Sequence, residues 1–142
     1  MGEGDNVRRY VPDWEQYGID RERYLELLHM CRQYPLWKRK LSDLTGIQAV
    51  KMDGQPHGSG VGDPVAALVE KRERFTAKIS MIEGCALDVG DGSWAKALIQ
   101  NICYGQGYHM IDPLIMPTSH RQTFFKRRKE FFILLNERAE RK

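Results

Sequence analysis

The chain has no long apolar run. No stretch of its 142 residues approaches the roughly 18 consecutive apolar residues that a membrane-spanning helix needs. The N-terminal residues lack the apolar core of a secretory signal peptide. The three cysteines, Cys31, Cys85 and Cys103, are widely spaced and odd in number, which argues against a disulfide framework. These absences predict a soluble protein of the reducing cytoplasm.

Sequence signatures of metal, nucleotide and catalytic sites are missing as well. The histidines and cysteines show neither Cys-x-x-Cys nor His-x-x-x-His spacing, which argues against a structural zinc. The Gly-rich stretch 51–63 lacks the Gly-Lys-Ser/Thr ending of a P-loop. Asp88 and Asp91 fall in a helix-capping turn, which explains them better than an acid/base pair does. We therefore expect no metal, no cofactor and no enzymatic activity.

Positive charge is concentrated at the C-terminus. The formal net charge is +3, but the residues after Pro117 hold 8 Lys/Arg against 3 Asp/Glu, whereas residues 1–117 hold 14 against 16. A local basic surface attracts polyanions such as DNA through counterion release, whatever the charge of the whole chain. The alternative is that this run is only the solvated face of a helix.

Helical periodicity dominates the chain. Asp20 is a candidate N-cap for one helix, and Pro35 fits the first turn of a second helix. Asp63 followed by Pro64 opens the longest helix, whose apolar residues alternate in steps of three and four, with one exception at Arg72. This seam consists of Val65, Leu68, Phe75, Ile79, Ile82 and Ala86. We predict an all-α fold, a small helical bundle with a C-terminal helix-turn-helix.

Four regions follow from these patterns. Residues 1–50 form an N-terminal tail and helical hairpin, and residues 51–62 a flexible Gly-rich loop. Residues 63–90 form a long central helix, and residues 91–142 the helix-turn-helix DNA-binding region. The seam either buries the two N-terminal helices within a monomer or pairs with itself in a homodimer. We favour the monomer, because short helices need a packing partner.

The C-terminal region has the order of a helix-turn-helix. A helix that begins near Ser93 ends before Gly105, and a short middle helix starts at Tyr108, with Tyr108 and Ile111 pointing inward. Asp112 and Pro113 must end that helix early, because the residue before proline disfavours the α conformation. The turn that follows is then sealed against Trp94 and the Phe pairs by Leu114, Ile115 and Met116.

The final helix, residues 119–141, has an apolar stripe and a polar, basic face, as a recognition helix requires. The candidate DNA-binding residues are Ser119, His120, Arg121, Gln122, Thr123, Lys126, Arg127 and Lys129. Among them, Gln122 can pair bidentately with adenine. Arg128 falls in the middle of the apolar stripe, which predicts a structural role for it.

The ending of the chain resembles a known family. It reads Arg121-x-x-Phe124-Phe125-x-x-Arg128-Lys129-x-Phe131-Phe132-x-Leu134-Leu135 and is similar to phage-encoded late-gene transcriptional activators of the RinA/ArpU kind, which share a helix-turn-helix similar to region 4 of bacterial sigma factors. The segment Gln33-Tyr34-Pro35-Leu36-Trp37 also resembles small proteins of Firmicute prophages. The resemblance implies a transcriptional activator of phage or prophage origin, with double-stranded DNA and host RNA polymerase as partners.

Two other functions fit the same sequence. One is a protein-binding inhibitor or adaptor of phage origin that acts on host RNA polymerase or a host defence protein. The other is a DNA-packaging or structural component, which would form ring-sized oligomers.

Overall fold

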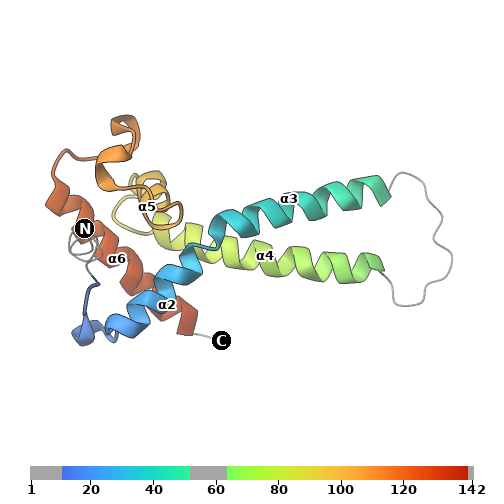
Figure 1. The fold of residues 1–142 in the computed structure, drawn as a ribbon, viewed down its shortest axis with the longest axis horizontal. Helices are drawn as coiled ribbons and strands as arrows, with labels where there is room; N and C mark the ends of the chain where they lie inside the picture. Colours follow the sequence, from blue (N-terminus) through green and yellow to red (C-terminus); the bar gives the residue numbers. More distant parts are fainter. Residues whose placement is uncertain (1–10, 52–63, 141–142) are drawn as a thin grey trace, which may run out of the picture.

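The computed structural model describes residues 11–51 and 64–140, and the regular elements of these residues are helical apart from a β-bridge between Trp14 and Ile19 (Figure 1). The α-helices are α2 (Arg21–Cys31), α3 (Tyr34–Lys51), α4 (Pro64–Leu87), α5 (Ala95–Ile102) and α6 (Arg121–Glu140). The 3-10 turns are η1 (Glu15–Tyr17), η2 (Tyr108–Met110) and η3 (Pro113–Ile115). The predicted all-α bundle is confirmed. Residues 52–62 of the expected Gly-rich loop lie outside the described residues.

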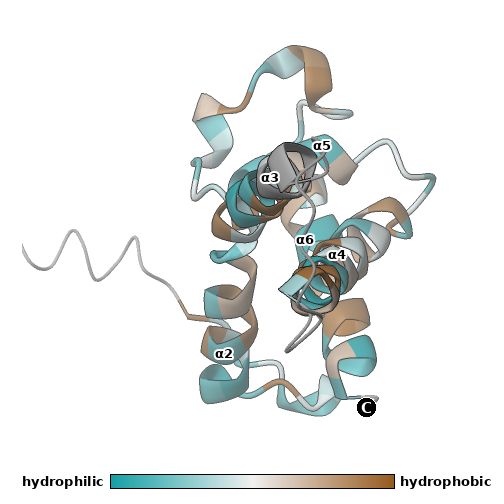
Figure 2. Ribbon diagram, turned by 90° about the vertical axis from the view of Figure 1, so that its right-hand side faces the viewer, coloured by the Kyte–Doolittle hydropathy of each residue, from teal (hydrophilic) through white to brown (hydrophobic). Residues whose placement is uncertain are grey.

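The molecule consists of a body and an arm. The arm is the pair α3 and α4, which run antiparallel and extend away from α2, α5 and α6 (Figure 1). Figure 2 looks along the arm toward the body, with α3 and α4 seen end-on in front. None of the helices in the described ranges is long and apolar enough to cross a membrane.

The hairpin expected within residues 1–50 is not the one that forms. Arg32, between α2 and α3, keeps helical φ and ψ angles of −68° and −12°, and α3 continues away from α2 instead of folding back along it (Figure 1). The antiparallel pair is instead α3 with α4, while α2 packs against α6. The seam of α4 is buried at its base, at Ile79 and Ile82, whereas Val65 near its other end is 46% exposed.

The core of the body is built on the aromatic residues of α6. Phe124, Phe131, Phe132 and Leu135 are at most 1% exposed. Tyr24 of α2 packs on Phe132 with ring centroids 4.9 Å apart. Each such side chain contributes roughly 1.5–3 kcal/mol by leaving water. The apolar stripe predicted for this helix docks it, except at Phe125, which was expected in the stripe and is 36% exposed.

The middle helix expected from Tyr108 is a single 3-10 turn, η2. Asp112 is extended, with ψ of 122°, and its side chain accepts a hydrogen bond from the Leu114 N–H, which starts η3 in place of a continued helix. Ile111 is buried as predicted, but Leu114 is 91% exposed and does not seal the turn. Ile115 and Met116 do pack against the core. The helix-turn-helix remains a prediction.

Candidate nucleic-acid interface

The start of α6 forms one end of the body. The helix begins at Arg121, two residues later than the sequence pattern predicts, so Ser119 and His120 precede it. Thr118 Oγ1 accepts a hydrogen bond from the His120 N–H at 3.1 Å, and the His120 carbonyl accepts one from the Phe124 N–H at 3.2 Å. These contacts fix the direction in which the helix leaves the loop.

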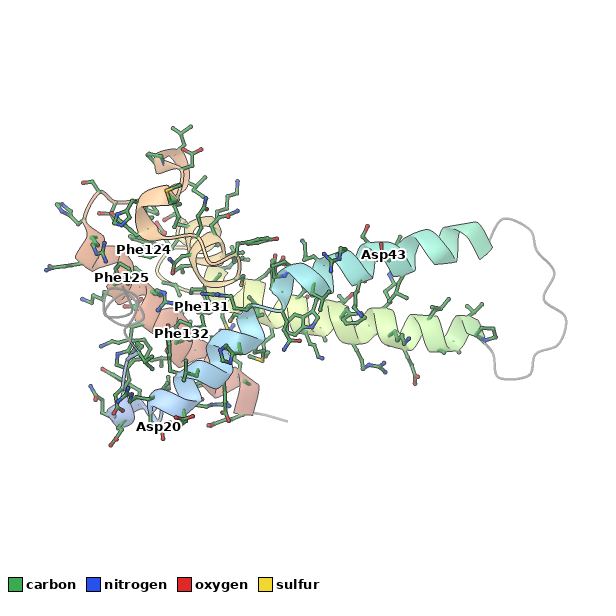
Figure 3. The ribbon with its side chains drawn as sticks, in the orientation of Figure 1. Asp20, Asp43, Phe124, Phe125, Phe131 and Phe132 are labelled. Carbon is green, nitrogen blue, oxygen red and sulfur yellow. The ribbon has the colours of Figure 1, made fainter. Side chains whose placement is uncertain are left out.

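The first two turns of α6 present polar side chains to solvent. Arg121, Gln122 and Lys126 are exposed, and Thr123 is half-buried. Gln122 and Lys126 are four residues apart and therefore lie one above the other on the same face. Figure 3 shows Phe124 and Phe125 in this part of α6 and Phe131 and Phe132 further along it. Phe124, Phe131 and Phe132 are buried, so the exposed polar face lies opposite rings that pack in the core.

Arg121 rests on aromatic rings at the edge of this face. Its guanidinium lies 5.0 Å from the ring centroid of Phe125 and 5.8 Å from that of Tyr108. Such cation–π contacts contribute about 0.5–1 kcal/mol at exposed sites. They leave the side chain exposed while narrowing the directions in which it can point.

Arg127 and Lys129, both expected to face DNA, are turned onto the protein. Arg127 Nη1 donates to both carboxylate oxygens of Glu130, at 3.0 and 3.1 Å, and its guanidinium lies 5.7 Å from the Trp94 ring. The Nε of Arg127 is buried without a hydrogen-bond partner. Lys129 Nζ lies 5.2 Å from the ring of Tyr17. The exposed part of the candidate site therefore narrows to Ser119, His120, Arg121, Gln122 and Lys126.

Arg128 lies on the inward side of α6, which agrees with its predicted structural role. Its Nε donates to Asn101 Oδ1 of α5 at 2.7 Å, and its Nη2 donates to the Tyr24 hydroxyl of α2 at 2.9 Å. The guanidinium also lies 5.1 Å from the Phe132 ring. One side chain thus joins three helices.

Two more polar contacts hold the rest of α6. Arg23 Nε donates to Asn136 Oδ1 at 2.7 Å, and Arg138 Nη2 donates to Asp88 at the end of α4. Sequence reasoning missed Asn136, although a polar residue beside a buried Leu135 is a usable signal for an internal hydrogen bond. A helix fixed by such contacts presents its exposed residues in one geometry, which recognition of a rigid duplex requires.

The cysteines lie in the hydrophobic core. All three are buried, and a hydrogen bond to Cys103 together with burial raises the pKa of the Cys31 thiol. Burial also raises the pKa of Cys85, although Arg138 opposes this shift. Protonated, buried thiols are poor nucleophiles. Across residues 11–51 and 64–140, no three His, Cys, Asp or Glu side chains are grouped so that they could hold a metal ion.

Comparison of the chain with protein-family models, with curated proteins and with solved structures found no match.

Proposed function

We propose that the protein is a DNA-binding transcriptional regulator of phage or prophage origin that reads double-stranded DNA with the first half of α6. One observation carries this proposal: Arg121, Gln122 and Lys126 are exposed on a helix whose other side buries Phe124, Phe131 and Leu135 in the core. The sequence from Thr118 to Lys129 contains no Asp or Glu. The major groove, about 12 Å wide, admits an α-helix, and its phosphate walls favour a helix face without acids.

Each exposed residue has a chemical role in this proposal. The Gln122 amide can pair bidentately with the N6 and N7 atoms of an adenine. Lys126 and Arg121 lie at positions suited to phosphates on either side of the groove. Ser119 and His120 supply further hydrogen-bonding groups at the helix start, and Thr123 lies beside them.

The proposed regulator acts as a monomer that needs a second contact. The seam of α4 packs on α3 within one chain, which supports a monomer. A monomer with one recognition helix reads a single short half-site and binds weakly alone. The resemblance to activators with a sigma-like region suggests that host RNA polymerase provides the additional contact.

A gel-shift titration with the DNA that flanks the gene tests the proposal. We expect binding that weakens with salt, and a loss of sequence preference but not of all affinity in Gln122→Ala. Lys96→Gln, on exposed α5 surface, is the matched control and should bind like the wild-type protein. Affinity that does not depend on salt, or a Gln122→Ala variant with an unchanged sequence preference, would contradict the proposed recognition.

A protein-binding inhibitor or adaptor is the second candidate, and exposed apolar residues favour it. Leu114 is 91% exposed, Met110 69% and Leu87 56%. A groove between the end of α4 and η3 is lined by Leu87, Ala95, Leu114, Ile115 and Met116, among others. If this function is the correct one, a complex with purified host RNA polymerase should be lost in Leu114→Asp, and the wild-type protein should not bind DNA.

A further inference from the structure

The arm has two long flanks, which are the side surfaces to either side of the seam between α3 and α4. Three contacts fix the register of α3 against α4. Lys38 Nζ lies 3.7 Å from Glu83 Oε2, and the Tyr34 hydroxyl donates to the same oxygen at 2.6 Å. On the other side of the seam, Lys78 Nζ lies 5.3 Å from the centroid of the Trp37 ring. In an antiparallel helix pair, such contacts determine which residues face each other along the whole interface.

The heptad pattern assigns the remaining residues to the flanks. Seam positions alternate in steps of three and four, as in Tyr34, Trp37 and Leu41 of α3 and in Phe75, Ile79 and Ile82 of α4. The flank that contains Lys38 and Glu83 also receives Glu73, so its charges are mixed. The heptad pattern assigns Lys40, Lys71, Arg74 and Lys78 to the opposite flank, with Lys40 and Lys78 at facing positions of the two helices.

We name this second surface the basic flank, defined by Lys40, Lys71, Arg74 and Lys78. All four residues are exposed. Within the described residues, none of the four takes part in an ion pair, and Lys78 contacts the Trp37 ring instead. Asp43, labelled on α3 in Figure 3, is the acid that the heptad pattern places on the same side of α3. On α4, Glu70 precedes Arg74 by four residues and borders the flank. Four cations against these two acids leave the flank with a net positive charge.

Like charges that face each other across a helix pair cost stability, whereas an opposite-charge pair such as Lys38 and Glu83 does not. A bound polyanion removes this repulsion. Lys71 and Lys78 are separated by about 10 Å along the helix axis, from a rise of 1.5 Å per residue. Duplex DNA carries one charge per roughly 1.7 Å of its axis, so several phosphates fall within reach of this stripe.

We propose that the basic flank is a second nucleic-acid contact, which binds phosphates without reading sequence. The inference rests on the proposed function because its ligand is the same DNA. A membrane-binding helix would need an apolar face beside its basic one. Here Trp37, Ile79 and Ile82 are buried in the seam, and Leu36, which is 36% exposed and four residues before Lys40, is a single apolar side chain and not an apolar face. The flank therefore suits a uniformly charged backbone, and it adds a DNA contact within the same chain to the one made by α6, beside the contact proposed for host RNA polymerase.

Equilibrium binding of the full chain to a labelled duplex, measured across a salt series, tests the inference. The test variant is Lys40→Gln/Lys71→Gln/Arg74→Gln, which keeps Lys78 and its contact with Trp37. We expect the slope of log K against log salt to fall by about three, and affinity near physiological salt to fall roughly tenfold to a hundredfold. The preference between specific and scrambled DNA should stay unchanged, because phosphate contacts carry no sequence information.

The control variant carries the same charge change elsewhere. Arg21→Gln/Arg39→Gln/Lys96→Gln also removes three exposed cations, none of them on the basic flank or in α6. Its salt slope should match that of the wild-type protein. Circular dichroism must show equal helicity for both variants.

The outcomes separate the two proposals. If the wild-type protein binds DNA and the two triple variants behave alike, the basic flank is not a contact, and recognition by α6 still stands. If the wild-type protein does not bind DNA at any salt concentration, both proposals fail. Binding to vesicles that contain phosphatidylserine but not to DNA would make the flank a membrane-binding surface and would overturn the inference.

Discussion

Replacing Arg128 with alanine tests how α6 is held in the body. The side chain supplies hydrogen bonds to Asn101 at 2.7 Å and to Tyr24 at 2.9 Å, and its guanidinium packs near the Phe132 ring. Arg128→Ala leaves both acceptors without this donor and removes the apolar stem that packs between the helices. We therefore expect a less stable protein with the same fold.

The size of the effect follows from these contacts. A hydrogen bond to a charged group contributes about 1.5–3 kcal/mol, and a cation–π contact about 0.5–2 kcal/mol. Folding partly dehydrates the guanidinium, and the absence of this cost in the alanine variant opposes these terms by several kcal/mol. We expect a net loss of about 2–3 kcal/mol in the free energy of unfolding. For a chain of this length, that loss corresponds to a drop of roughly 6–12 °C in the melting temperature.

Urea unfolding followed by circular dichroism measures this loss. Lys126→Ala is the control, because Lys126 is exposed on the same helix and should change the midpoint little. Arg128→Lys should fall between the two, since an ammonium group cannot reproduce the guanidinium's planar donor geometry. Equal midpoints for Arg128→Ala and Lys126→Ala would refute the role assigned to Arg128.

Three further predictions address recognition and the arm. Gln122→Ala should lose about 1–3 kcal/mol of discrimination at one base position in a binding-site selection, and an unchanged sequence profile would exclude the contact of Gln122 with a base. Lys126→Gln should lower the slope of log K against log salt by about one, and an unchanged slope would exclude the contact of Lys126 with a phosphate. Ile79→Glu buries a carboxylate in the seam and should unfold the arm, which circular dichroism would show as lost helicity. If the variant keeps its helicity and light scattering gives the wild-type protein the mass of a dimer, the seam lies between two chains. Burial and the hydrogen bond to Glu83 raise the pKa of Tyr34 above its ordinary value of 10.0, so the folded state binds this proton more tightly. Stability should therefore fall as pH rises above about 10, and Tyr34→Phe should reduce that fall; equal pH dependence in both proteins would contradict the effect of Tyr34.

The helices themselves could be predicted from local signals. The Asp20 side chain caps α2 by accepting from the Arg23 N–H at 2.8 Å, and α4 starts at Pro64. Both features depend on neighbouring residues, which the sequence displays directly. The partner of each helix was harder to predict, because periodicity identifies an apolar face but not the surface that covers it. For this reason α2 was expected against the central helix and lies against α6.

For the candidate site too, the sequence predicted the direction of side chains along one helix but not their contacts with distant segments. A rotation of 100° per residue places Gln122 outward and Arg128 inward, and both are found there. By the same rotation Lys129 points within about 20° of Gln122 and Arg127 about 140° away from it. Tyr17 and Trp94, which belong to distant segments, decide where these two side chains turn. Leu114 was expected to be buried on its hydrophobicity alone, but the local bond from its N–H to Asp112 directs the chain outward.

Apolar residues of α4 are less buried toward the far end of the arm, and this has a consequence for amide hydrogen exchange. Ile82 and Ala86 at the base are fully buried, whereas Val65 and Val69 toward the other end are 46% and 37% exposed. Local opening costs least where few apolar contacts must be broken. Exchange should therefore be fast in the first turns of α4 and slow toward Ala86, while the amides around Phe131 exchange only when the whole body unfolds. The arm would then open progressively from its far end. The protein would consist of an arm that unfolds gradually and a body that unfolds in one cooperative step.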